Sequence, residues 1–154
     1  MTEIENRDLL KAEYLHLQGV IEAFDGRALT IKAWSITFSL TSIGAAYAAN
    51  AWPILIVAAL SSLMFWTIEG FWKTFQYAHY DRAGKLEKYF AGEGDEPVPM
   101  QIAASWYVQW KKGGTRRLVR IMMWPHVALP HIFVLLTATA LLVLHIGDQL
   151  TVAP

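Results

Sequence analysis

The longest uncharged segment of the sequence is AWSITFSLTSIGAAYAANAWPILIVAALSSLMFWTI, which covers residues 33–68. It holds 36 residues without Asp, Glu, Lys or Arg, whereas about 20 apolar residues suffice for a helix that spans a bilayer. Asn50-Ala51-Trp52-Pro53 interrupts the segment near its middle. Asn favours turns, and Pro suits the first turn of a new helix. We therefore expect a tight hairpin of two membrane-spanning helices.

A second uncharged segment, Ile121–Gly147, is 27 residues long and predicts a third span. The chain is 55% hydrophobic and 17% charged, whereas soluble domains carry about 25% charged residues. The sequence thus predicts an all-α integral membrane protein. It contains no cysteine, which excludes disulfides and thiolate metal sites. The first 30 residues are polar and show no signal peptide.

The basic residues predict the orientation of the spans. Of the thirteen Lys and Arg, four precede the first span and nine lie between Lys73 and Arg120. The hairpin turn and the tail after Gly147 have none. Because basic loops stay on the cytoplasmic side, we expect a membrane protein with a cytoplasmic N-terminus and an external C-terminus.

Helical patterns extend beyond the uncharged segments. We expect one helix over 6–49, a second over 53–90, an amphipathic helix lying at the membrane surface over 98–113, and the third span over 121–146. The spans and these extensions form a single membrane domain. An apolar seam at steps of three and four marks the first cytoplasmic extension, as in coiled coils, and is a candidate oligomer contact. Its residues are Leu10, Tyr14, Leu17, Ile21 and Phe24.

The first span is polar for a helix that faces lipid. Its hydroxyl side chains form two adjacent stripes, and small residues let membrane helices approach closely. The stripes either pack against the other spans or line a water-filled pore in an oligomer. Their residues are Ser35, Ser39 and Ser42, with Thr37 and Thr41.

Charged residues also occur at the cytoplasmic end of the hairpin. Glu69 and Lys73 are one helical turn apart, and Lys32 should lie across the hairpin from them. Ionisable residues at membrane depth are costly and usually paired. We expect either a structural ion pair or a charged gate at a pore mouth.

Two histidines, His126 and His131, begin the third span. A pair of histidines can bind a metal or act as a pH sensor. The spacing of this pair is irregular for a metal site, however, and no carboxylate is near in the sequence. We expect interfacial histidines, no metal and no cofactor; a haem or quinone subunit would rest on the histidines alone.

A basic run without acidic residues precedes the third span. It favours anionic lipid headgroups over nucleic acid, because it lacks interleaved aromatic residues and any nucleic-acid-binding signature. Its residues are Lys111, Lys112, Arg116, Arg117 and Arg120. Hydrolase, phosphate-binding and metalloprotease motifs are absent, so we do not expect an enzyme.

Two segments, FDGRALTIKAWS at 24–35 and FWTIEGFWKTFQ at 65–76, resemble small uncharacterised bacterial membrane proteins. More loosely, the chain resembles the SLATT-like two-span effectors of anti-phage systems over residues 6–90; the third span lies outside this similarity. The resemblance implies an oligomeric membrane-permeabilising effector of the bacterial inner membrane that is switched by a partner or signal, and it transfers no functional residue.

These features predict a small homo-oligomeric membrane protein that forms or gates a pore. The alternative is a membrane anchor that recruits a soluble partner through its cytoplasmic helices. The expected partners are membrane lipids, further copies of the chain and, for the anchor, a soluble cytoplasmic protein.

Overall fold

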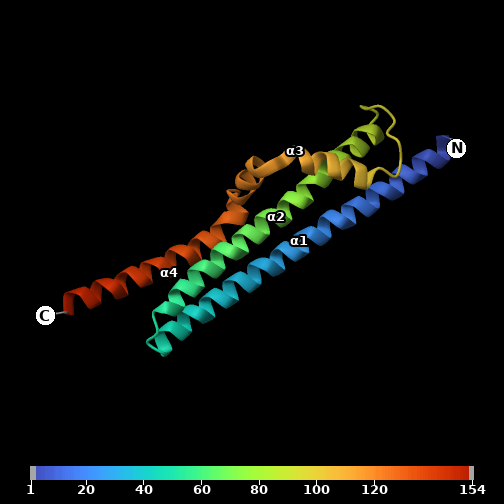
Figure 1. The fold of residues 1–154 in the computed structure, drawn as a ribbon. Helices are drawn as coiled ribbons and strands as arrows, with labels where there is room; N and C mark the ends of the chain where they lie inside the picture. Colours follow the sequence, from blue (N-terminus) through green and yellow to red (C-terminus); the bar gives the residue numbers. More distant parts are fainter. Residues whose placement is uncertain (1–2, 153–154) are drawn as a thin grey trace. The chain divides into compact units, whose positions relative to one another are not determined.

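A computed structural model describes the backbone of residues 3–152 and the side chains of residues 3–148. This part of the chain forms four helices, α1 (Glu3–Ala48), α2 (Pro53–Phe90), α3 (Ile102–Met122) and α4 (Pro125–Val152) (Figure 1). The prediction of an all-helical chain is confirmed. Two helices, α2 and α4, are long and apolar enough to cross a membrane. The Ser, Thr and Gly residues of α1 lower its hydropathy.

The turn between α1 and α2 follows from its sequence. Asn50 adopts a positive φ of 51°, and Asn accepts this left-handed conformation more readily than most residues. The Ala51 N–H donates to the Ala46 carbonyl (2.9 Å) and the Asn50 N–H donates to the Tyr47 carbonyl (3.2 Å). This is the hydrogen-bond pattern of a Schellman C-cap. Pro53 then begins α2, where its missing N–H has no cost.

The third helix differs from the expected range 98–113. It begins at Ile102 because the chain bends at Pro99 and Met100, with Met100 at φ 61°. It continues to Met122 because the next proline after residue 113 is Pro125. Inside it, Gly114 has φ 54° and ψ −169°, a conformation that essentially only glycine adopts. The amphipathic segment and the basic run therefore form one broken helix.

The fourth helix begins at Pro125, later than the expected residue 121, and continues past residue 146. Ile121 and Met122 belong to the end of α3, and the chain turns at Met123 and Trp124. Pro125 occupies the first helical turn, as proline prefers. Pro130 lies inside α4 and leaves one backbone hydrogen bond of the helix unmade.

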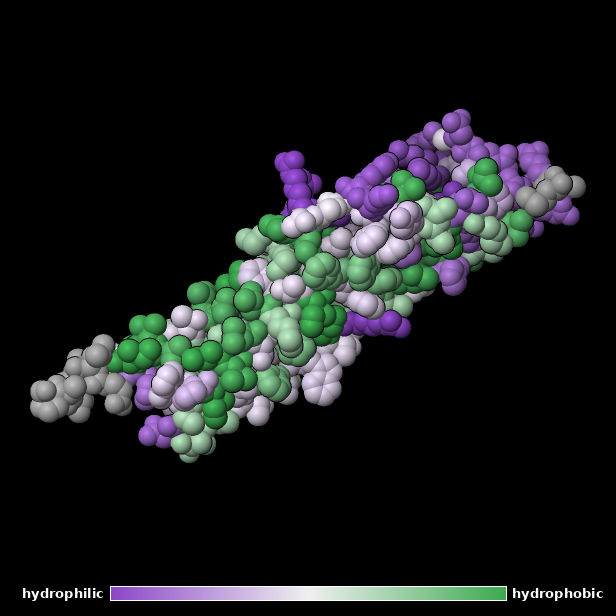
Figure 2. Space-filling view, in the orientation of Figure 1, coloured by the Kyte–Doolittle hydropathy of each residue, from purple (hydrophilic) through white to green (hydrophobic). Residues whose placement is uncertain are grey.

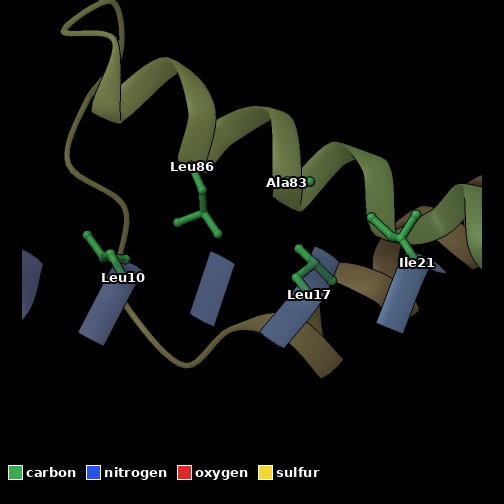
Figure 3. Packing of buried hydrophobic residues seen from close by; sticks show 5 residues of the cluster. All are labelled: Leu10, Leu17, Ile21, Ala83 and Leu86. Carbon is green, nitrogen blue, oxygen red and sulfur yellow. The ribbon is translucent and has the colours of Figure 1, made fainter. Parts of the chain in front are cut away.

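The chain divides into two compact units, and α1 and α2 contribute to both. Unit 1 comprises the residues up to Arg27 together with Phe71–Val119. Its buried core is formed by Leu10, Leu17 and Ile21 of α1 with Ala83 and Leu86 of α2 (Figure 3).

This core corrects the expected oligomer seam. Leu10, Leu17 and Ile21 are buried against α2 of the same chain, and Tyr14 packs on the same cluster. Phe24 contacts Trp72 of α2, with ring centroids 4.9 Å apart. The pattern correctly marks a helix–helix contact, but the partner helix is intramolecular.

Unit 2 comprises Ala28–Gly70 and the residues from Arg120 on. Small side chains fill much of its interior, including Ala46, Ala58 and Ala138, while many large apolar side chains are exposed. Figure 2 shows hydrophobic residues covering the visible face of α4. The exposed apolar side chains come from all three helices of the unit. They include Ile36, Phe38 and Leu40 of α1, Val57, Leu60 and Met64 of α2, and Phe133, Leu136 and Val143 of α4.

Candidate functional site

The interior of unit 2 contains a cluster of polar side chains. Its members are fully buried, with 0% exposure, and come from all three helices: Ser35 and Ser39 of α1, Ser62 and Glu69 of α2, and His131 of α4. The steps of four in α1 and seven in α2 place the residues of each helix on one face. A polar centre under an apolar surface reverses the usual arrangement of a soluble protein.

His131 lies at the centre of this cluster. Its Nδ1 is 3.0 Å from the Ser35 hydroxyl and its Nε2 is 2.9 Å from the Glu69 carboxylate. The Ser62 hydroxyl donates to the His131 backbone carbonyl at 2.9 Å. Side chains from α1 and α2 thus hold both the ring and the backbone of His131.

The carboxylate of Glu69 has a second partner in Lys32 of α1. The Lys32 ammonium lies 2.5 Å from the other Glu69 oxygen, and its side chain is 17% exposed. This ion pair confirms the expected proximity of Lys32 and Glu69 across the hairpin. Lys73, predicted as the third member, instead pairs with Asp25 and donates to Gln76 at 2.9 Å. The charges therefore form separate pairs in the two units.

The contacts in this cluster are ones that a neutral His131 ring can make. A charged Lys32 balances an ionised Glu69, and a carboxylate can only accept hydrogen bonds. His131 then donates its Nε2–H to Glu69 and accepts the Ser35 O–H at Nδ1, as a neutral ring does. This arrangement carries no net charge. It satisfies the rule that buried charges must be paired.

Among the described residues, the Ser39 hydroxyl has no hydrogen-bond partner, although it is fully buried. It lies one helical turn from Ser35 on the same face of α1. A buried polar group without a partner costs about 1–3 kcal/mol. Ser39 therefore leaves one unused hydrogen-bonding position on the face of α1 that carries Ser35.

The other predicted hydroxyl residues lie elsewhere. Thr37 and Thr41 are exposed on α1, and the half-buried Ser42 donates to the Phe38 carbonyl at 2.9 Å. The predicted hydroxyl residues therefore divide between the interior of unit 2, where Ser35 and Ser39 lie, and its surface. Only the exposed pair is free to face a pore or another copy.

The structure also separates the two histidines. His126 contacts the Trp124 ring, with centroids 5.5 Å apart, whereas His131 is buried. The described residues contain no group of three or more side chains suited to hold a metal ion. No carboxylate lies near the histidines in the sequence, but folding brings Glu69 to His131 although they are 62 positions apart.

The basic residues of the run are mostly exposed. Lys111, Lys112, Arg116 and Arg120 are on the surface. Arg117 instead folds back over Tyr77 and donates to the Gln109 carbonyl at 2.7 Å. Four of the five predicted headgroup contacts are thus accessible.

Unit 1 holds a second buried charge network that sequence reasoning missed. The Arg82 guanidinium makes two hydrogen bonds of 2.9 Å to the Glu13 carboxylate and donates to the Val98 carbonyl at 2.7 Å. Glu13 also accepts the backbone N–H of Met100 (2.8 Å) and of Gln101 (3.3 Å), immediately before α3. A carboxylate at a helix N-terminus is electrostatically favourable. The network fixes the connection between α2 and α3.

The surroundings of Glu13 set its protonation. Burial raises the pKa of this carboxyl, but the hydrogen bonds from Arg82 and Met100 and the charge of Arg82 outweigh burial. The net pKa lies below its ordinary value of 4.5. Glu13 is therefore ionised at neutral pH and available to both Arg82 and the start of α3.

Searches with this sequence and structure find no matching family model, no matching curated protein and no matching solved structure.

Proposed function

We propose that the protein crosses the bacterial inner membrane three times and self-associates to form or gate a path for ions. The observation that supports this proposal is that unit 2 has a polar interior and an apolar surface. Glu69, His131 and three serines are buried there beneath exposed Leu, Ile, Val and Phe side chains. In lipid such a surface is the stable one, whereas in water it would drive aggregation.

The first crossing is formed by residues 33–48 of α1. Its mean hydropathy is lowered by the hydroxyl and small residues, two of which, Ser35 and Ser39, are hidden inside unit 2. The surface of the same segment includes Trp34, Ile36, Phe38 and Leu40. The exposed part of this helix thus suits contact with lipid, although its average composition is less apolar than that of α2 or α4.

The gate in this proposal is the cluster Lys32–Glu69–His131. Ionisable residues inside membrane segments mark ion pathways, proton relays and charge-dependent switches. Displacing the ring of His131 would remove its contacts with Ser35 of α1 and Glu69 of α2. That change would weaken the pairing that holds α1, α2 and α4 together.

The ion path itself would lie between copies of the chain. Thr37 and Thr41 are exposed on α1 one turn apart, with Gly44 following on the same face. Small and hydroxyl residues on a membrane helix favour close packing with another helix or contact with water. The resemblance to SLATT-like effectors extends this proposal to permeabilisation of the membrane in anti-phage defence.

Flux measurements with the purified full chain in liposomes test the proposed path. We expect oligomers by native mass spectrometry and ion flux in a potassium-gradient dye assay. Thr41→Trp should lower the flux several-fold by narrowing the path. Leu40→Trp, a change at the neighbouring exposed residue, should not. A strictly monomeric protein without flux would contradict the proposal.

A second candidate is the membrane anchor. One observation favours it: a groove on unit 1 combines both signs of charge with apolar side chains, and it is lined by Arg7, Asp8, Lys11, Tyr14, Leu15, Glu87 and Phe90. Leu15 is 61% exposed there. A stable complex with one soluble protein, combined with no liposome flux, would favour the anchor.

A further inference from the structure

A cavity of about 470 Å³ lies in unit 1 between α2 and the broken helix α3. Its walls are mainly apolar and aromatic, and its polar residues include Lys111 and Thr115. The lining residues are Phe71, Thr74, Phe75, Trp110, Lys111, Gly114, Thr115 and Leu118. The volume lies within the usual range of small-ligand sites.

The break at Gly114 shapes this cavity. The glycine has a positive φ of 54°, and it lines the cavity midway between Trp110 and Leu118. A regular helix would present residues three and four apart on one continuous face. The break redirects α3 so that both of its segments contribute walls.

Tryptophans hold the aromatic wall in place. The Trp106 indole N–H donates to the Phe75 carbonyl at 3.0 Å. Trp106 and Trp110 are stacked, with centroids 5.6 Å apart and planes inclined by 5°. Trp110 also contacts the Phe75 ring at 6.3 Å. These contacts order the wall without filling the cavity.

The charged residues of α3 are all basic. No Asp or Glu occurs from residue 97 to residue 147. Lys111 lines the cavity and its ammonium lies 5.9 Å from the Tyr107 ring centroid, while Arg116 is exposed nearby in the sequence. An apolar cavity with a cationic rim matches a ligand that has a hydrocarbon chain and an anionic head.

We propose that this cavity binds one anionic phospholipid, with an acyl chain against Phe75, Trp110 and Leu118 and the phosphate at Lys111 and Thr115. The site goes beyond the proposed ion path, because it lies in unit 1 and needs neither flux nor oligomers. A free phosphate would leave the aromatic walls without a partner, and a lipid without net negative charge would leave the positive charge of Lys111 unbalanced.

Native mass spectrometry of the full chain in detergent tests this site, with phosphatidylglycerol and phosphatidylcholine titrated separately. We expect one phosphatidylglycerol retained per chain in preference to phosphatidylcholine. Lys111→Gln should lower the phosphatidylglycerol affinity about fivefold, the effect of one basic residue at an anionic lipid surface. Lys88→Gln removes the same charge from an exposed position on α2 outside the cavity and should leave the affinity unchanged.

Two further measurements distinguish a bound anionic phospholipid from other occupants of the cavity. Leu118→Trp should fill the cavity and release the lipid while the helix content measured by circular dichroism stays constant. Equal retention of both lipids, displacement of phosphatidylglycerol by inorganic phosphate alone, or phosphatidylglycerol still bound to the Leu118→Trp variant would each overturn the proposal. None of these results depends on whether the protein conducts ions.

Discussion

Glu69→Gln lowers the free energy of unfolding by about 3–5 kcal/mol, the cost of breaking a buried ion pair by removing one partner. The variant leaves the Lys32 ammonium beside a neutral amide and weakens the hydrogen bond from His131. Since the Lys32 side chain is 17% exposed, water relieves part of the penalty and we expect the lower end of this range. Denaturant titration of the full chain in detergent micelles measures it.

Two controls separate the loss of charge balance from a general effect of the substitution. Glu22→Gln makes the same chemical change at an exposed position of α1 and should alter stability by less than about 0.5 kcal/mol. The double variant Lys32→Met with Glu69→Gln removes both charges and should recover much of the lost stability. If Glu69→Gln unfolds at the same denaturant concentration as Glu22→Gln, the buried pair does not hold unit 2 together.

Arg82→Met has a comparable effect on unit 1, about 3–5 kcal/mol, because it leaves the buried Glu13 carboxylate without its cation. The backbone N–H groups of Met100 and Gln101 still donate to Glu13, but the connection to α3 loses its link to Val98. Hydrogen exchange should therefore accelerate at Met100 and Gln101. Lys85→Met is the matched control, since Lys85 lies one turn along α2 and its side chain, which pairs with Asp81, is 58% exposed.

The same network predicts how unit 1 responds to acid. The pKa of Glu13 is lower in the folded than in the unfolded chain, so the unfolded chain binds more protons near pH 4.5 and below. The stabilisation is thus complete above pH 4.5 and is lost as the pH falls through the folded-state pKa. Arg82→Met should reduce this acid sensitivity. Unchanged exchange at Met100 and Gln101, or an unchanged acid response, would show that Arg82 does not secure the connection.

The sequence was sufficient to predict the hairpin, because its signals are local. The length of the segments without charged residues marks the apolar helices, and Asn50 and Pro53 mark the turn between α1 and α2. The pairing of Lys32 with Glu69 also followed, since both lie at similar distances from that turn. Such arguments need only the rise of a helix and an antiparallel arrangement.

The predictions that failed concern contacts between residues that are far apart in the sequence. The contact of His131 with Glu69 joins α4 to α2 across 62 positions, and no local pattern in the sequence determines it. The seam at Leu10 and Leu17 has the same pattern whether its partner is α2 or another copy. The Gly114 conformation was unpredictable because glycine is also tolerated inside regular helices.

The three-crossing arrangement on which the proposed functions depend is tested most directly by labelling single cysteines. The native chain has no cysteine, so each introduced thiol is the only target of a membrane-impermeant maleimide. Suitable exposed positions are Glu5, Ala49, Glu93 and Asp148. We predict that cysteines at 49 and 148 react in right-side-out membrane vesicles and those at 5 and 93 only in inside-out vesicles. Labelling of positions 5 and 148 from the same face would contradict three crossings.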